Sequence, residues 1–320
     1  MQRWTCILGR GGGFIMVDLT TQFCEQTFQN PVSTASGTYG FGMEYGEFLP
    51  VERLGSITTK GLTLHQRKGN QGVRITETPS GMLNAIGLEN PGVNYFVEEV
   101  LPKMKERLGK AKIIANISGD TLEDYEKIAG ILSDTGDISA LEVNISCPNV
   151  KAGGMAFGVT CQGASEVCRI VKQASKIPVI MKLSPNVTDI VEIAESVEQA
   201  GADGLSLINT LLGMAIDIYK QQPTIGNITA GLSGRAIRPI GIRMVYQVSQ
   251  RVSIPILGMG GISTWEDAIE YILAGATMVS IGAGCFKNPQ APFEILEGIT
   301  SYCEKMGFNS PSEMVGLSWK

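Results

Sequence analysis

A cysteine and an asparagine at the end of one apolar run are the residues of this chain best placed to do chemistry. The run begins at Leu141, carries Asn144 and Cys147, and opens after Pro148 into the loop NVKAGGMAFG. A buried strand needs neither an amide nor a thiol at its carboxyl end. Two interpretations of Cys147 are open: a small hydrophobe that fills the core, or a reactive thiol that the glycine-rich loop could cover.

Polar and small residues close other apolar runs in the same way. The strand ends read Ser36-Gly37, Lys60-Gly61, Asn116, Asn144 with Cys147, Lys182, Asn209-Thr210, Gly260-Gly261 and Gly282. Taken singly, a lysine could simply be solvated, an asparagine could cap a helix and a glycine pair could form a tight turn. Together they predict a polar pocket that holds a planar heterocycle on amides and a phosphate on the last glycines.

Eight short apolar segments, each followed by a helix-like stretch, must position these residues. We expect strands at Pro31–Ser36, Ser56–Lys60, Lys112–Ile117, Ala140–Ser146, Pro178–Leu183, Gly204–Asn209, Ile254–Met259 and Met278–Gly282. Alternating strands and helices imply a parallel sheet with right-handed crossovers, and eight is the strand number of the TIM barrel. The sequence therefore predicts an α/β fold, a (β/α)8 TIM barrel with these strand ends at one rim.

Helix signals lie between the strands. An apolar face runs over residues 93–108, where Pro102 is expected to kink or divide the helix. Asp120 with Glu123, and Ser263 with Glu266, suggest capping boxes or variants of them. The repeated Ala-Gly-Ala at 200–202 and 274–276 predicts two helix ends just before two strands.

Two connections are too long for ordinary turns. They are Gly61–Tyr95, after the second predicted strand, and Leu211–Gly234, after the sixth. Long loops that follow barrel strands lie at the catalytic face and are usually functional, so we expect active-site insertions. Decoration or an oligomer contact is the alternative.

Composition narrows the class of protein. The chain has 320 residues, 18% charged, with net charge −5 and no basic cluster, which argues against a nucleic-acid surface. No apolar run reaches the ~18 residues of a membrane span. Seven cysteines without a CxxC motif and a single histidine predict reduced thiols, no metal site and no histidine triad. We expect residues 1–16 to be a disordered extension or a misplaced start ahead of Met16, residues 17–320 to form a single catalytic domain, and the protein to be cytoplasmic.

The long motifs resemble those of the dihydroorotate dehydrogenases, the flavoproteins of pyrimidine biosynthesis. The resemblance covers the chain from about Val17 to its end and rests on NISCPNVKAGGMAFG, ITETPSGMLNAIGLENPG, KLSPNVTDI, ADGLSLINTLLGM, GLSGRAIRP and LGMGGI. VKAGGMAFG and MLNAIGL are most similar to the class 1B catalytic subunit. The resemblance implies a TIM barrel with FMN at its carboxyl rim and the oxidation of (S)-dihydroorotate to orotate in UMP synthesis.

The same resemblance implies a role for each site residue. Cys147 would take the proton from C5 of dihydroorotate while hydride passes from C6 to the flavin, and Lys182 would favour the negative charge of reduced flavin. The implied substrate residues are Lys60, Asn84, Ala85, Ile86, Gly87, Leu88, Asn144, Asn209 and Thr210. The implied flavin residues are Ser36, Lys60, Gly61, Asn116, Asn144, Lys182, Ile208 and Gly234. The implied phosphate residues are Gly260, Gly261, Gly282 and Ala283, the last at a position where the family more often has threonine.

Electron disposal points to a second protein, because the chain has no cysteine cluster for an iron–sulfur centre and no convincing dinucleotide fingerprint. Similarity to class 1B implies a partner subunit with FAD and a [2Fe-2S] cluster that passes electrons to NAD, in a heterotetramer around a homodimer of catalytic subunits. A class 1A enzyme that reduces fumarate directly is the first alternative. A flavin-binding barrel without chemistry and a phosphate-binding isomerase or aldolase are the others.

Overall fold

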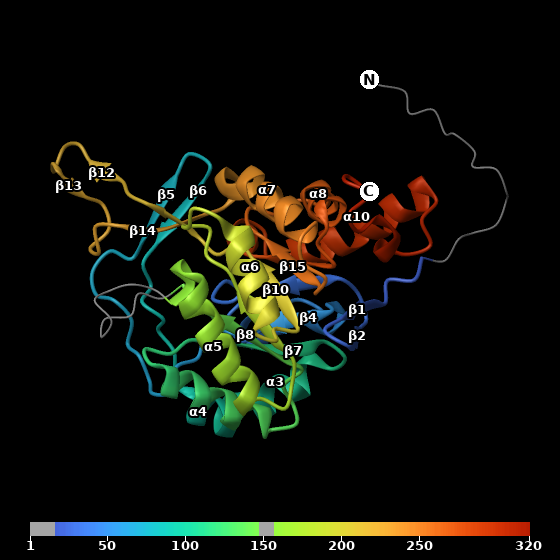
Figure 1. Cartoon of the computed structure of the whole chain (residues 1–320). Coiled ribbons are helices and arrows are strands. Elements are labelled where there is room, and N and C mark those ends of the chain that lie inside the picture. Colours follow the sequence, from blue (N-terminus) through green and yellow to red (C-terminus); the bar gives the residue numbers. More distant parts are fainter. Residues whose placement is uncertain (1–16, 147–156) are drawn as a thin grey trace.

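Eight parallel strands close into a barrel at the centre of the computed structural model, which describes residues 17–146 and 157–320 (Figure 1). The strands follow one another around the barrel in chain order, and the last pairs with the first. They are β3 (Val32–Thr34), β4 (Ser56–Thr58), β7 (Lys112–Ile117), β8 (Ala140–Asn144), β9 (Val179–Lys182), β10 (Gly204–Leu207), β15 (Ile256–Met259) and β16 (Met278–Ile281). Each lies inside a predicted segment, so the TIM-barrel prediction is confirmed.

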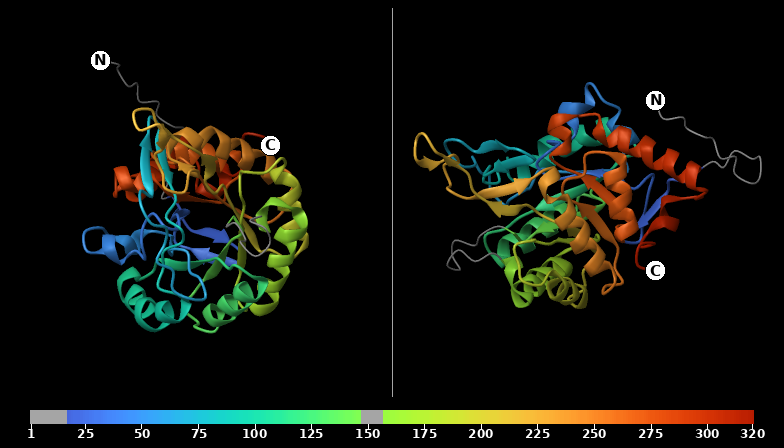
Figure 2. Two further views of the ribbon diagram at one scale, coloured as in Figure 1. Left: turned by 90° about the vertical axis from the view of Figure 1, so that its left-hand side faces the viewer. Right: turned by 90° about the horizontal axis from the view of Figure 1, so that it is seen from above.

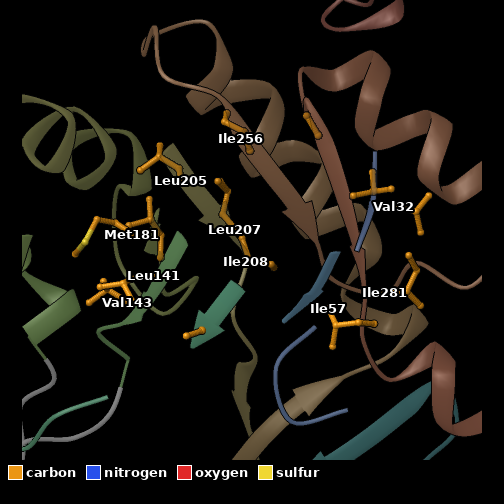
Figure 3. Close-up of a cluster of buried hydrophobic side chains, with 14 of the residues drawn as sticks. Val32, Ile57, Leu141, Val143, Met181, Leu205, Leu207, Ile208, Ile256 and Ile281 are labelled. Atoms are coloured by element: carbon orange, nitrogen blue, oxygen red, sulfur yellow. The ribbon is translucent and has the colours of Figure 1, made fainter. Parts of the chain in front are cut away.

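Successive side chains of the barrel strands point alternately to the hydrophobic core outside the barrel and to the interior of the barrel. Leu141 and Val143 of β8 are fully buried in the main hydrophobic core, together with outward-facing residues of the other strands (Figure 3). Successive side chains of a strand point to opposite faces, so Glu142 and Asn144 point to the other side, into the barrel. The same eight strands thus hold the helices outside and present polar groups inside.

Helices surround the barrel, as the view along it in Figure 2 (left) shows. The α-helices are α1 (Met43–Gly46), α2 (Val93–Tyr95), α3 (Leu101–Leu108), α4 (Leu122–Ser133), α5 (Cys161–Ala174), α6 (Ile190–Gln199), α7 (Arg238–Ser249), α8 (Trp265–Ala274), α9 (Gly284–Lys287) and α10 (Ala291–Met306). Short 3-10 helices are η1 (Val51–Arg53), η3 (Phe157–Val159), η4 (Arg235–Ile237) and η5 (Pro311–Met314). Within the described ranges, none of these helices combines the length and the apolar composition that a bilayer crossing requires.

Two predicted helix starts are wrong by one residue. The capping boxes pair Thr121 with Asp124 and Thr264 with Asp267, in place of the expected Asp120 and Ser263 boxes. In each case the threonine hydroxyl accepts the backbone N–H three residues later, while the aspartate accepts the N–H of the threonine. The predicted helix ends are confirmed: Gly201 and Gly275 follow α6 and α8 with φ of 98° and 123°.

The helix expected over residues 93–108 is divided, as Pro102 predicted. A π-helical stretch, η2 (Phe96–Val100), separates α2 from α3, and Pro102 occupies the first turn of α3. Proline lacks the N–H that an uninterrupted α-helix would need there. The division leaves Phe96, Met104 and Leu108 buried against the barrel.

A hairpin closes the amino-terminal end of the barrel. Its strands, β1 (Thr21–Phe23) and β2 (Gln26–Phe28), bring Phe23 and Phe28 against inward-facing residues such as Ile180 and Leu257. The phenyl rings meet edge to face with centroids 6.1 Å apart. With this end sealed by apolar side chains, the carboxyl end is left for the site.

The two long connections form a sheet, where the sequence suggested loops. Strands β5 (Ile75–Thr78) and β6 (Gly81–Asn84) come from the first connection, and β11 (Leu211–Gly213) and β14 (Ala230–Ser233) from the second. They pair in the order β11-β14-β6-β5. The second connection also carries a small ladder, β12 (Ile216–Asp217) with β13 (Gln222–Pro223), which projects beyond the barrel (Figure 1). This insertion sheet stands over the carboxyl rim.

Candidate active site

A cavity of about 600 Å³ opens between the carboxyl rim of the barrel and the insertion sheet. Every predicted site residue that the structure describes lines its wall: Ser36, Lys60, Gly61, Asn84, Ala85, Ile86, Gly87, Leu88, Asn116, Asn144, Lys182, Ile208, Asn209, Thr210, Gly234, Gly260, Gly261, Gly282 and Ala283. The predicted base, Cys147, lies outside the described residues. The described residues that were predicted from distant parts of the sequence therefore line one cavity. The role of each residue stays a prediction.

Asn144 anchors the corner of the cavity where β8 ends. Its Oδ1 atom accepts the side-chain amide of Asn209 at 3.1 Å and the backbone N–H of Ser146 at 3.2 Å. The hydroxyl of Tyr125 donates to its backbone carbonyl at 2.7 Å. The two contacts of Oδ1 fix the orientation of the Asn144 side chain, whose NH2 group makes no hydrogen bond with another described residue. The buried Ser146 hydroxyl has no hydrogen-bond partner among the described residues and also borders the cavity.

Asparagines at the rim do not cap helices, which removes one of the alternative interpretations. The side-chain caps of α4, α5, α6 and α8 are Thr121, Thr160, Asp189 and Thr264. Asn116, Asn144 and Asn209 line the cavity instead, and the amides of Asn116 and Asn209 donate to Glu142 and Asn144.

The floor of the cavity carries a buried charge pair, in which Lys182 was a predicted site residue and its partner Glu142 was missed. Glu142 is fully buried, and its Oε2 atom accepts Lys182 Nζ at 3.1 Å and Asn116 Nδ2 at 2.6 Å. Lys182 and Asn116 are only 6% and 2% exposed. The available signal was a carboxylate inside the apolar run LEVN, since a charge in a buried strand requires a partner. Which residue pairs with it is decided by the neighbouring strands.

Glycines shape the opposite end of the cavity, after β15 and β16. Gly260 and Gly261 have φ of 121° and 74°, a region that other residues rarely adopt. A Cβ atom on Gly261 would lie 2.7 Å from the Gly234 carbonyl and 2.8 Å from the Arg238 nitrogen. The chain therefore passes close to its neighbours there, with bare backbone at the surface, as anion-binding turns require.

The insertion sheet adds a second ion pair to the wall. Arg74, beside β5, donates to Glu89 at 2.6 Å, and both residues border the cavity. The hydrogen bond from Arg74, with a smaller contribution from the charge of Lys60, holds the pKa of Glu89 below its usual value. Sequence reasoning missed this pair because the hairpin β5-β6 and the turn after β6 are needed to bring the two residues together. Leu88, with φ of 53°, and Gly87, with φ of 78°, shape that turn.

Fold and site together define a class of protein. A closed TIM barrel whose carboxyl rim combines two lysines, several amides and a glycine turn after its last two strands is typical of enzymes that bind a phosphorylated cofactor or substrate.

Comparison with known proteins identifies the family. The family model described as dihydroorotate dehydrogenase matches residues 18–303. A protein named dihydroorotate dehydrogenase B (NAD(+)), catalytic subunit, from Bacteroides thetaiotaomicron is 51% identical over 301 residues, which cover 94% of this chain and 99% of that protein. Proteins of the same name are 52% identical over 290 residues in Porphyromonas gingivalis, covering 91% of this chain and 94% of theirs, and 54% identical over 289 residues in Desulforamulus reducens, covering 90% and 94%. The chain belongs to the dihydroorotate dehydrogenase family.

Proposed function

We propose that this protein is the catalytic subunit of an NAD-linked dihydroorotate dehydrogenase and oxidises (S)-dihydroorotate to orotate in pyrimidine biosynthesis. Family membership supports the reaction, and the names of relatives that match almost end to end support the NAD-linked class. The observation that carries the proposal for the site is the convergence of all described candidate residues on one cavity.

Two features of the cavity support FMN as its ligand. Bare backbone at Gly260 and Gly261 suits the phosphate, and the Ser146 hydroxyl in the wall has no hydrogen-bond partner within residues 17–146 and 157–320. FMN, when bound, supplies the acceptor for hydride. We assign the ring system to Ser36, Lys60, Gly61, Asn116, Asn144, Lys182, Ile208 and Gly234, and the phosphate to Gly260, Gly261, Gly282 and Ala283. Release of one FMN per chain from the purified protein is the expected result, and a colourless protein contradicts the assignment.

Dihydroorotate carries both N–H and C=O groups on its ring and a carboxylate beside it. Amides match such an edge because they offer donors and acceptors side by side. We assign the substrate to Asn144, Asn209 and Thr210 from the barrel rim, to Lys60, and to Asn84, Ala85, Ile86, Gly87 and Leu88 from the insertion sheet and the turn after it. The positive charge of Lys60 complements the carboxylate.

We propose Cys147 as the general base that takes the C5 proton. Its place three residues after Asn144, which lines the cavity, supports this role. A thiolate is the form that accepts a proton, so the site must favour ionisation of this thiol. Cys147→Ser replaces the thiol by a hydroxyl of similar size with a much higher pKa, and we expect it to slow reduction of the bound flavin by ~10²-fold or more. An unchanged rate rules out Cys147 as the base.

We further propose that electrons leave the flavin through a partner subunit that carries FAD and a [2Fe-2S] cluster. The assembly would contain two copies of each subunit and would be located in the cytoplasm. The relatives are named as the catalytic subunit of an NAD(+) enzyme, which supports a separate partner subunit. The isolated chain should then reduce NAD slowly and gain rapid turnover when the partner is added. Rapid NAD reduction by the chain alone contradicts the partner, and rapid fumarate reduction favours the class 1A alternative.

A further inference from the structure

Glu142 is the described residue beneath the cavity whose charge has no part in the assignments above. It sits at the middle of β8, and its neighbours in the barrel are β7 on one side and β9 on the other. Asn116 is its register partner on β7, and Lys182 of β9 is the register partner of Asn144. One carboxylate oxygen therefore connects three adjacent strands just below the rim.

Glu142 does not border the cavity itself, so any effect that it has on the cavity must pass through Lys182 and Asn116. It is fully buried, and its second oxygen, Oε1, has no hydrogen-bond partner among the described residues. Polar side chains cost free energy when buried unless they are paired, and Lys182 is the cation within ion-pair distance, at 3.1 Å. The carboxylate thus holds the lysine and the amide in one arrangement.

The charge balance has a consequence for any redox group above the pair. Lys182 alone would place one uncompensated positive charge at the floor, which would favour a reduced, negatively charged ring. Glu142 offsets that charge, so the floor as a whole is close to neutral. Lys182 contributes a directed N–H donor while its field is reduced.

We propose that Glu142 is a positioning residue that holds Lys182 and Asn116 at the flavin and lowers its reduction potential by offsetting the charge of Lys182. The inference rests on the FMN site proposed above. A lower potential makes the flavin a weaker acceptor of hydride from the substrate and a stronger donor to the next carrier. Glu142 thereby sets how the free-energy change is distributed between reduction of the flavin by the substrate and its reoxidation by the next carrier.

The test is the reduction potential of the flavin-loaded protein, measured by anaerobic titration against a reference dye. Glu142→Gln keeps the shape and removes the charge. We expect it to shift the reduction equilibrium toward reduced flavin by about tenfold, which is about 30 mV for a two-electron couple. A shift of at least about threefold in this direction supports the proposal, and a smaller or opposite shift overturns it.

A second variant carries the test if Glu142→Gln does not load flavin, since a lone buried Lys182 destabilises the fold. The double variant Glu142→Gln/Lys182→Gln removes both charges and leaves no unpaired ion. If Glu142 offsets Lys182, its reduction equilibrium stays within about threefold of the wild type. If Glu142 has no such effect, loss of Lys182 alone moves the equilibrium toward oxidised flavin by more than that, and the proposal fails.

Two controls separate charge from structure. Glu142→Asp keeps the charge on a shorter side chain and should leave the potential near that of the wild type. Asp203→Asn changes another ion-paired carboxylate, 2.6 Å from Lys172 and at the amino end of β10, and should not move the potential. A wild-type protein that holds no flavin would contradict the proposed function, whereas variants that hold flavin with an unmoved potential contradict only the role of Glu142.

Discussion

Replacing Gly261 by alanine tests the glycine turn that we assign to phosphate. Gly261 has φ of 74°, and alanine in this left-handed region costs about 1–2 kcal/mol. The new Cβ would also lie 2.7 Å from the Gly234 carbonyl and 2.8 Å from the Arg238 nitrogen, which are backbone atoms that must shift. Overpacking of this kind adds about 1–3 kcal/mol, while the loss of disorder in the unfolded chain returns about 0.4–1 kcal/mol. We expect a net loss of about 3 kcal/mol.

Gly136 provides a matched control. Its φ is 73°, but a Cβ atom there would meet nothing within 4 Å, so Gly136→Ala should cost about 1 kcal/mol. Urea denaturation of flavin-free protein measures both variants without the stabilisation that a bound ligand adds. Flavin retained after gel filtration gives the functional result, and only Gly261→Ala should lose it. Equal losses of stability, or full flavin retention by Gly261→Ala, would refute the close-approach argument.

Three further predictions concern other parts of the structure. Asn90→Ala should lower the free energy of unfolding by about 3 kcal/mol, because the buried Asn90 amide makes four hydrogen bonds at the base of the insertion sheet. Asn70→Ala removes one side-chain hydrogen bond and should cost about 1 kcal/mol. Equal losses of stability for the two variants in urea denaturation would contradict this prediction. Burial raises the pKa of Cys285 to about 12, so its thiol stays neutral when folded but ionises in the unfolded chain above about pH 8.5; stability should fall as pH rises from there toward 12. Cys285→Ala should reduce that slope by about 1 kcal/mol per pH unit between about pH 9 and 10, and an unchanged slope refutes the assignment. Asn209→Asp should raise KM for dihydroorotate at least ~10-fold, because a carboxylate cannot donate to Asn144 and repels the substrate; steady-state kinetics with an unchanged KM would place Asn209 outside the substrate site.

The barrel was predictable because its signals are local. The strands are short, mostly apolar runs, and in β8 Leu141 and Val143 alternate with polar residues in the period that a strand imposes. The motif match then placed the rim residues, which needed no knowledge of which strands are neighbours. The capping boxes show the limit of local patterns, since Asp120 and Thr121 are both good caps and only the backbone selects between them.

Contacts between distant segments could not be predicted. Asn84 of β6 pairs with Gly231 of β14, so the insertion sheet depends on two connections that meet only in the folded chain. Glu142 was missed in the sequence, and its ion-pair partner, Lys182, lies on the next strand of the barrel. In both cases the missing information is the register between strands, which the hydrophobic pattern alone does not supply.

Anaerobic mixing of the flavin-loaded protein with dihydroorotate tests the central claim most directly. We predict that the visible absorbance of the flavin bleaches and that one orotate forms per flavin reduced. A protein that holds flavin in this cavity but neither bleaches nor forms orotate would contradict the proposed reaction.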